Sequence, residues 1–235
     1  MNGRIKRQEP KERLRFPKIG NIRCGMKVTK NGRTYPTSTD YFIGTGKYEK
    51  FFNDAYGDKP SVIQVVFLDD KPNLVCDERL ELRDNEGKLV AYGDGLEFMV
   101  FNPKTEKYEP FLLEAHPEML ERIAEKNKGK WKTTLTLKFL VPKISNVIGY
   151  WELKTNAEAS SIPEITGVFD QVLANKGFIR GILFDLSVTM HTSNKPGVKS
   201  KYPVISLVPN HSEANKKLIS NHFKIEDEKQ ALSGG

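Results

Sequence analysis

The sequence predicts an α+β protein made mainly of antiparallel, twisted sheet, with three to four helices and a short, disordered, basic N-terminal arm. Short segments in which apolar and polar residues alternate outnumber the segments that have helical periodicity. Turn signals, such as the Asn-Gly pair at residues 31–32, separate these segments at intervals that favour antiparallel pairing. Many strands with few helices between them are typical of the α+β class.

Length and composition predict a globular protein of the cytoplasm. The chain has 235 residues, of which 38% are hydrophobic and 29% charged, and its net charge is +7. No apolar segment approaches the ~20 residues of a membrane span, and residues 1–10 lack the apolar core of a secretory signal. The two cysteines, Cys24 and Cys76, are therefore expected to be free thiols in a reducing compartment.

Three parts are expected along the chain. Residues 1–16 form a basic flexible arm, and residues 17–210 form a single α+β domain. An alternative within that domain is a pair of subdomains that meet near residues 103–130. Residues 211–235 form a polar helix and a flexible tail.

A β-hairpin is predicted near the N-terminus. The Asn-Gly pair at residues 31–32 fits a type I′ turn, because both central positions of that turn need positive φ. A two-residue loop pairs Lys30 with Arg33, and the same register places Arg23 opposite Asp40. The tyrosines of the second strand then share the apolar face of the hairpin.

The core of the fold is expected between Trp131 and Met190, as two strands, a helix and a third strand. Trp151 lies on the apolar parity of the second strand, so we expect it to be buried. Ser161 and Glu164 have the spacing of a capping box, in which the serine hydroxyl accepts a hydrogen bond from the glutamate N–H. Gly177 supplies the left-handed end of the helix.

The other expected elements follow from the same periodicities. Strands are predicted at residues 20–28, 35–41, 62–68, 80–82, 89–92, 96–101, 131–139, 150–155, 182–190 and 202–208, and helices at residues 47–56, 117–127, 161–176 and 212–230.

Two basic segments are the candidate sites for binding nucleic acid or a partner. A cluster of cations beside a folded domain attracts polyanions. The candidate residues are Arg4, Lys6, Arg7, Lys11, Arg13 and Arg15 in the arm, and Arg23, Lys27, Lys30 and Arg33 in the hairpin. The alternative for the arm is a tail that only increases solubility. The alternative for the hairpin is that it does not bind nucleic acid, because its tyrosines face away from Arg23 and Lys27.

One short pattern is compatible with catalysis. Glu152-x-Lys154 on a strand resembles the carboxylate and lysine of some Mg²⁺-dependent nucleases, which need a further acidic residue, with Asp94 and Glu114 as candidates. The alternative is a solvated strand face. The four histidines and two cysteines show no metal-ligand spacing. We therefore expect no catalytic residue, no metal and no cofactor.

A series of short motifs runs in order from about residue 19 to residue 208. It comprises Gly20-x-Ile22-Arg23-x-Gly25-x-Lys27, Tyr35-Pro36, Asp40-Tyr41-Phe42, Tyr56-Gly57-x-Lys59-Pro60, Gly93-Asp94-Gly95, Phe139-Leu140-x-Pro142, Gly149-x-Trp151 and Ser161-Ile162. This series resembles the recombination directionality factor-like proteins of phages.

The resemblance implies a phage or mobile-element protein that works in the host-cell cytoplasm. Founding members of that family bind a large serine integrase and switch it from integration to excision. Many relatives carry a cysteine cluster, spaced like zinc ligands, before the Phe-Leu-x-Pro strand. In this sequence the corresponding segment, residues 117–127, is expected to form a helix and contains no cysteine, so no structural zinc is expected.

Three functions follow as hypotheses. The first is a non-enzymatic accessory protein of DNA recombination that binds a serine integrase, DNA or both. The second is a single-stranded-DNA-binding accessory of phage replication or recombination. The third is a Mg²⁺-dependent nuclease that uses Glu152 and Lys154.

The basic arm yields a first testable prediction. Residues 1–16 hold six basic and two acidic groups, which is +4 of the net +7. If the protein binds DNA, deleting the arm should flatten the log–log dependence of affinity on salt by several units, because each phosphate contact contributes roughly −0.7 on single strands and −0.9 on duplex. The fold should survive, because no predicted core residue precedes Phe16. An unchanged salt slope, measured by anisotropy titration, would mark the arm as a solubilising tail.

Overall fold

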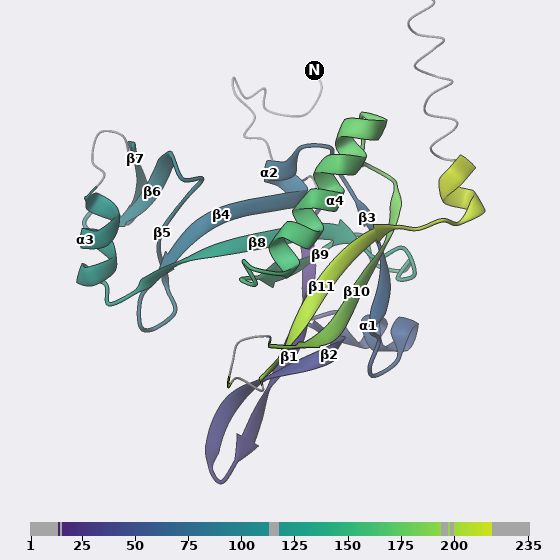
Figure 1. The fold of residues 1–235 in the computed structure, drawn as a ribbon, viewed down its shortest axis with the longest axis horizontal. Coiled ribbons are helices and arrows are strands. Elements are labelled where there is room, and N and C mark those ends of the chain that lie inside the picture. The colour runs from purple at the N-terminus through teal and green to yellow at the C-terminus, as the bar shows by residue number, and fades with distance from the viewer. Residues whose placement is uncertain (1–13, 15, 113–117, 194–196, 198–199, 218–235) are drawn as a thin grey trace, which may run out of the picture.

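The computed structural model describes residues 14, 16–112, 118–193, 197 and 200–217. The predicted class is confirmed, since antiparallel strands dominate the described residues and helices pack against them (Figure 1). In chain order the elements are β1 (Lys18–Lys30), β2 (Arg33–Thr45), α1 (Glu49–Tyr56), β3 (Val62–Phe67), α2 (Pro72–Val75), β4 (Cys76–Arg83), β5 (Leu89–Gly93), β6 (Glu97–Asn102), β7 (Lys107–Leu112), α3 (Met119–Lys126), β8 (Lys130–Leu140), β9 (Tyr150–Thr155), α4 (Ser161–Lys176), β10 (Leu183–Thr192) and β11 (Lys201–Pro209).

Strand β8 lies at the centre of the sheet and is paired along both edges. On one edge it pairs with β4 through residues 130–137 and with β3 through Phe139 and Leu140. On the other edge β9 pairs with residues 135–139. Strands β10 and β11 continue the sheet beyond β3, while β1 joins β9 in a parallel pair and leads into β2.

Two hydrophobic cores form on this sheet. The larger lies between the strands of the main body and α4, α1 and α2. The smaller is centred on Leu82, Ala91 and Ile123, in a small lobe made of β5, β6, β7, α3 and the adjoining ends of β4 and β8. Figure 1 shows β4 and β8 running from the main body into this lobe. The predicted division of the domain near residues 103–130 stays a prediction.

Strands β1 and β2 form the predicted hairpin, but only its outer part keeps the predicted register. Asn31 and Gly32 have φ of 52° and 72°, and the pairing runs from Lys30 with Arg33 to Gly25 with Ser38. Below that point Arg23 pairs with Ile43, so the predicted pairing of Arg23 with Asp40 is wrong.

The register changes because four residues of β2, Thr39–Phe42, stand opposite Cys24 alone. Their backbone makes other hydrogen bonds: the Phe42 N–H donates to the Pro60 carbonyl at 2.8 Å, and the Thr39 hydroxyl donates to the Tyr41 carbonyl at 2.7 Å. This bulge bends the hairpin where it leaves the main body, as bulges in antiparallel pairs do.

Trp151 is buried, as predicted, and it packs on backbone as well as side chains. Its side chain is 1% exposed, and its ring centroid lies 5.7 Å from that of Phe52. A Cβ built at Gly20 would lie 2.4 Å from the indole, and one at Gly44 would lie 2.6 Å from the Phe52 ring. Glycine at these two positions therefore allows β1 and β2 to approach the aromatic cluster closely.

The predicted capping box of α4 is wrong. The N-cap is Ser160, which makes no side-chain cap, and the Glu164 N–H donates to the Ser160 carbonyl at 3.2 Å. The Ser161 hydroxyl is buried and accepts instead from the Ile205 N–H of β11 at 2.9 Å. A tertiary hydrogen bond to the sheet thus replaces the local one. The left-handed end at Gly177, with φ of 73°, is as predicted.

Other differences from the predicted elements are local. Helix α2 and strand β7 were not predicted. The described residues therefore contain more helices than the three to four expected, because a helical segment at residues 213–217 adds to α1, α2, α3 and α4. The rest of the predicted C-terminal helix and its tail lie outside the described residues. The prediction that no core residue precedes Phe16 is wrong, because Leu14 packs against the larger core. A deletion of the arm that spares the core therefore ends at residue 13.

Two further properties of the described residues bear on function. Cys24 and Cys76 are free, as predicted, and burial raises the pKa of both thiols to about 12. Both are therefore protonated and unreactive at neutral pH. No helix in this part of the chain has the length and hydrophobicity needed to cross a membrane.

The packing of Trp151 yields the second prediction. Trp151→Ala should lower the free energy of unfolding by about 3–5 kcal/mol, because it removes a large aromatic side chain from a dense core. The control is Ile148→Ala, whose side chain is 75% exposed and should cost less than about 0.5 kcal/mol. Urea denaturation measures both changes, and equal losses for the two variants would contradict the burial of Trp151.

Candidate functional site

The outer part of the β1–β2 hairpin, residues 25–38, projects from the main body and is called the hairpin arm below (Figure 1). Every residue from Met26 to Ser38 is exposed. A two-stranded ribbon without further strands is only marginally stable in water, so the inner half of the hairpin must anchor it. The arm therefore presents both of its faces to solvent and to any partner.

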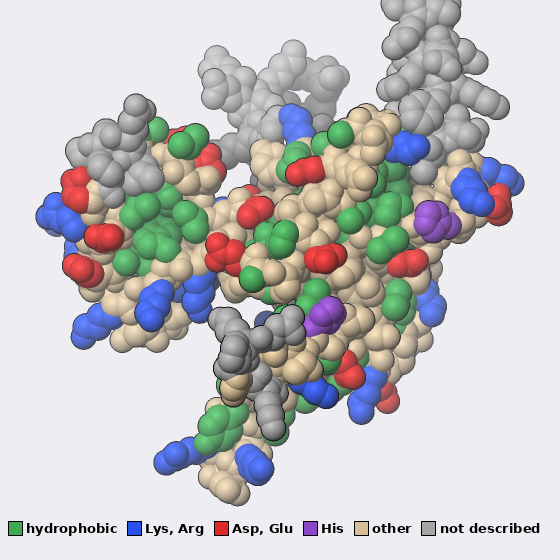
Figure 2. Space-filling model, viewed as in Figure 1, with side chains coloured by type: hydrophobic (Ala, Val, Ile, Leu, Met, Phe, Trp, Pro, Cys, Tyr) green, Lys and Arg blue, Asp and Glu red, His purple; other side chains and the backbone are tan. Residues whose placement is uncertain are grey.

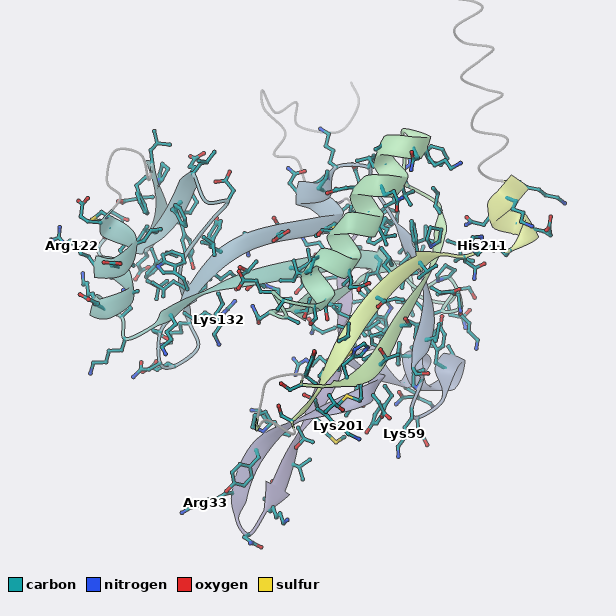
Figure 3. The ribbon with its side chains drawn as sticks, viewed as in Figure 1. Arg33, Lys59, Arg122, Lys132, Lys201 and His211 are labelled. Atoms are coloured by element: carbon teal, nitrogen blue, oxygen red, sulfur yellow. The ribbon has the colours of Figure 1, made fainter. Side chains whose placement is uncertain are left out.

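One face of the hairpin arm combines an apolar row with two cations. The register places Met26, Val28 and Tyr35 together on this face, and the Tyr35 side chain is 50% exposed. Lys30 and Arg33 continue the same face at the tip of the arm, where Figure 3 shows Arg33. Exposed apolar groups clustered beside cations are typical of surfaces that bind other molecules.

The predicted basic residues are only partly brought together. The hairpin arm places Lys30 and Arg33 side by side, while Lys27 lies on the opposite face beside Pro36. Arg23 is exposed at the base of the hairpin, away from the arm. The six predicted basic residues of the N-terminal arm, from Arg4 to Arg15, lie outside the described residues.

A second surface, which the sequence analysis missed, is a groove of about 620 Å³ between the main body and the small lobe. It lies between β4, the turn at residues 84–87, the start of β8 and the end of β9. Its charged lining residues are Arg83, Lys128, Lys130, Lys132 and Lys154, with Glu81 and Asp84. Five cations against two carboxylates make this groove, called the basic groove below, strongly positive. Figure 2 shows basic side chains on the lower side of the small lobe.

Glu81 organises the cations on the floor of the basic groove. Its carboxylate is 3% exposed and accepts from the Arg79 guanidinium at 3.0 Å and from the Arg83 guanidinium at 2.8 Å, with the Lys154 Nζ at 3.7 Å. Burial raises the pKa of Glu81, but the Arg83 hydrogen bond, the Lys154 charge and Arg79 outweigh it and hold the pKa below its ordinary value. Glu81 is thus ionised at neutral pH.

Aromatic rings continue the same face of the sheet from Glu81 into the small lobe. Tyr92 pairs with Glu81, and the Arg79 guanidinium lies 4.5 Å from the Tyr92 ring centroid. The rings of Tyr92 and Tyr108 lie 5.4 Å apart, as do those of Tyr108 and Phe101. These three rings, called the aromatic row below, lead away from the basic groove.

Glu152 and Lys154, the two residues of the nuclease hypothesis, form ion pairs with different partners. The Glu152 carboxylate lies 2.7 Å from the Lys18 Nζ, while Lys154 lies beside Glu81. Asp94 accepts from two N–H groups of its own turn, at Leu96 and Glu97, both at 2.9 Å. Glu114 lies outside the described residues, among which no group of three His, Cys, Asp or Glu is placed to hold a metal ion.

The basic groove had one signal in the sequence. Lys128, Lys130 and Lys132 alternate with other residues, and on a strand such alternation places Lys130 and Lys132 on one face. Arg83 and Lys154 carry no such signal, because they reach the groove only through the pairing of β4 and β9 with neighbouring segments of β8. Figure 3 shows Lys132 on β8 between the main body and the small lobe.

Comparison with known proteins gives one family. A family model described as Gp3-like, recombination directionality factor-like, matches residues 19–210. No curated protein and no solved structure matches the chain.

The charge of Glu81 yields the third prediction. Glu81→Gln should lower the free energy of unfolding by about 1–3 kcal/mol at pH 7, because hydrogen bonds to two guanidinium groups lose their ionic partner. The folded pKa lies below the unfolded value near 4.3, so the stabilisation is complete above that value and is lost as pH falls through the folded pKa.

The difference in the free energy of unfolding between wild type and Glu81→Gln should therefore be constant from pH 6 to 8 and shrink below about pH 4. Chemical denaturation at a series of pH values measures it. Glu158→Gln, at an exposed position, is the control and should show almost no difference. A Glu81→Gln difference that grows as pH falls would contradict the lowered pKa.

Proposed function

Because the chain belongs to the recombination directionality factor-like family, we propose that it is a non-enzymatic accessory protein of phage DNA recombination. It acts by binding a serine integrase, the partner class that the family resemblance implies, and it makes this contact through the hairpin arm. The observation that carries the proposal is that every residue from 26 to 38 is exposed, on a ribbon that projects from the body.

The side chains of the hairpin arm suit a protein partner. Tyr35 lies between Val28 and the tip cations on one face, and a half-exposed tyrosine flanked by aliphatic groups is a common anchor of protein interfaces. Lys30 and Arg33 would then meet carboxylates at the rim of the pocket that receives Tyr35. Such charges orient the encounter and raise the association rate.

Docking through side chains fits the arm better than addition of a strand to its edge. Lys27 and Pro36 are paired in the middle of the arm. Proline removes a backbone donor, and lysine on an edge strand discourages a further strand from pairing. The specificity of the contact therefore rests on the apolar face and not on backbone hydrogen bonds.

The non-enzymatic part of the proposal is supported by the use of the acidic residues on the described strands. Glu152 forms an ion pair with Lys18, Glu81 accepts hydrogen bonds from two arginines, and Asp94 accepts hydrogen bonds within a turn. Each of these carboxylates has a structural role. A nuclease centre would need carboxylates gathered around one metal ion.

Capture of the integrase is the fourth prediction. The tagged, full-length chain should retain a serine integrase from the same phage, and Tyr35→Ala should weaken the complex at least tenfold, because truncation of an aromatic anchor removes well over 1.4 kcal/mol of binding free energy. Biolayer interferometry at one salt concentration measures the dissociation constants.

The matched control is Tyr202→Ala on β11, which truncates an exposed tyrosine that is not part of the arm. It should leave the dissociation constant unchanged, and circular dichroism should show that both variants are folded. Equal weakening by the two variants, or undiminished binding by Tyr35→Ala, would exclude the hairpin arm as the docking element.

A further inference from the structure

We propose that the basic groove and the aromatic row together bind a single-stranded nucleic acid, with phosphates along the groove and bases on the rings. This site is separate from the hairpin arm and does not rest on the integrase contact. The groove and the aromatic row share no residue with the hairpin arm.

The groove carries an excess of positive charge, which favours an anionic ligand. Lys128, Lys130 and Lys132 are all exposed and come from one short segment at the start of β8. Of the two lining carboxylates, Glu81 is already bonded to two arginines, and Asp84 accepts from the N–H groups of Glu86 and Lys88 at 2.9 and 2.8 Å. These lysines are therefore available to a polyanion, and contacts between lysines and phosphates supply most sequence-independent affinity.

The floor of the groove is held rigid by hydrogen bonds, which reduces the cost of ordering it on binding. The Asn156 side chain donates to the Thr133 carbonyl at 2.8 Å and to the Thr134 hydroxyl at 2.6 Å, which joins β9 to β8. On the opposite wall the Arg83 guanidinium bonds the Gly87 carbonyl at 2.9 Å as well as Glu81. Each wall is thus tied by side-chain hydrogen bonds to a neighbouring strand or turn.

The aromatic row favours a single strand over a duplex. Arg79 lies between the groove and the row, because its guanidinium contacts Glu81 on one side and the Tyr92 ring on the other. The Phe101 ring at the far end is 38% exposed. Basic groups that follow a backbone, next to rings that stack on unpaired bases, are the usual components of single-strand sites. In a duplex the bases are already stacked and cannot reach these rings.

The phosphate contacts are tested by titrating the full-length protein with a fluorescent 20-nucleotide DNA, single-stranded or duplex, from about 50 to 200 mM salt. Wild type should bind the single strand more tightly. The variant Lys130→Ala/Lys132→Ala should flatten its log–log salt slope by roughly 1.4, since each lost phosphate contact contributes about 0.7. The control, Lys50→Ala/Lys201→Ala, removes the same charge from exposed positions on α1 and β11 and should leave the slope unchanged.

The ring contacts are tested by Phe101→Ala, with Leu112→Ala on the neighbouring strand β7 as the control. Phe101→Ala should weaken single-strand binding roughly fivefold or more, which corresponds to the loss of one stacked base, and should leave duplex binding unchanged. Leu112→Ala should change neither.

Equal affinity for single strand and duplex would overturn the proposal, as would an unchanged slope in the Lys130/Lys132 variant or no binding at 50 mM salt. The N-terminal arm is present in every variant, so the differences in affinity report the groove and the aromatic row. Failure of integrase capture leaves these results intact, and failure here leaves the integrase contact intact.

Discussion

The approach of Trp151 to the backbone of Gly20 holds the hairpin arm in place. The indole is buried beside Phe52, and β1 can pair with β9 at this point only because residue 20 has no Cβ to meet the ring at 2.4 Å. The parallel pairing of β1 with β9 extends only from Lys18 to Ile22, after which β1 continues outward into the arm. This contact acts together with the packing of Gly44 on Phe52 and the Phe42–Pro60 hydrogen bond to fix where the hairpin leaves the body.

Strand β9 contributes side chains to the regions of both proposed binding surfaces, because its side chains point alternately to the two faces of the sheet. Trp151 and Leu153 face the large core and fix the base of the hairpin, while Lys154 on the other face belongs to the basic groove. Side chains on a strand alternate between its faces, so one six-residue strand supports both sites without joining them. The two proposals are therefore compatible, because the proposed protein partner on the arm and the proposed nucleic acid in the groove would occupy separate surfaces.

The sequence predicts what local pattern controls and misses what depends on distant partners. The bounds of β9 follow from the alternation of apolar and polar residues and are confirmed. The turn at residues 31–32 follows from the preference of Asn and Gly for positive φ and is also confirmed. The bulge opposite Cys24 was missed because apolar parity continues through it, while the Phe42 N–H finds its acceptor on another segment. The Ser161 capping box failed for the same reason, since β11 offers a buried N–H to the hydroxyl. The basic groove was missed because its cations come from three strands.

We propose that the hairpin arm is the part of this protein that contacts a serine integrase. Hydrogen exchange of the backbone amides, compared with and without a bound serine integrase, tests it most directly. Amides of residues 26–38 exchange freely where they face solvent, and partner binding should slow them more than those of any other described segment. Slowed exchange confined to α4 and β11, with residues 26–38 unchanged, would show that the integrase binds elsewhere and would exclude the hairpin arm as its docking site.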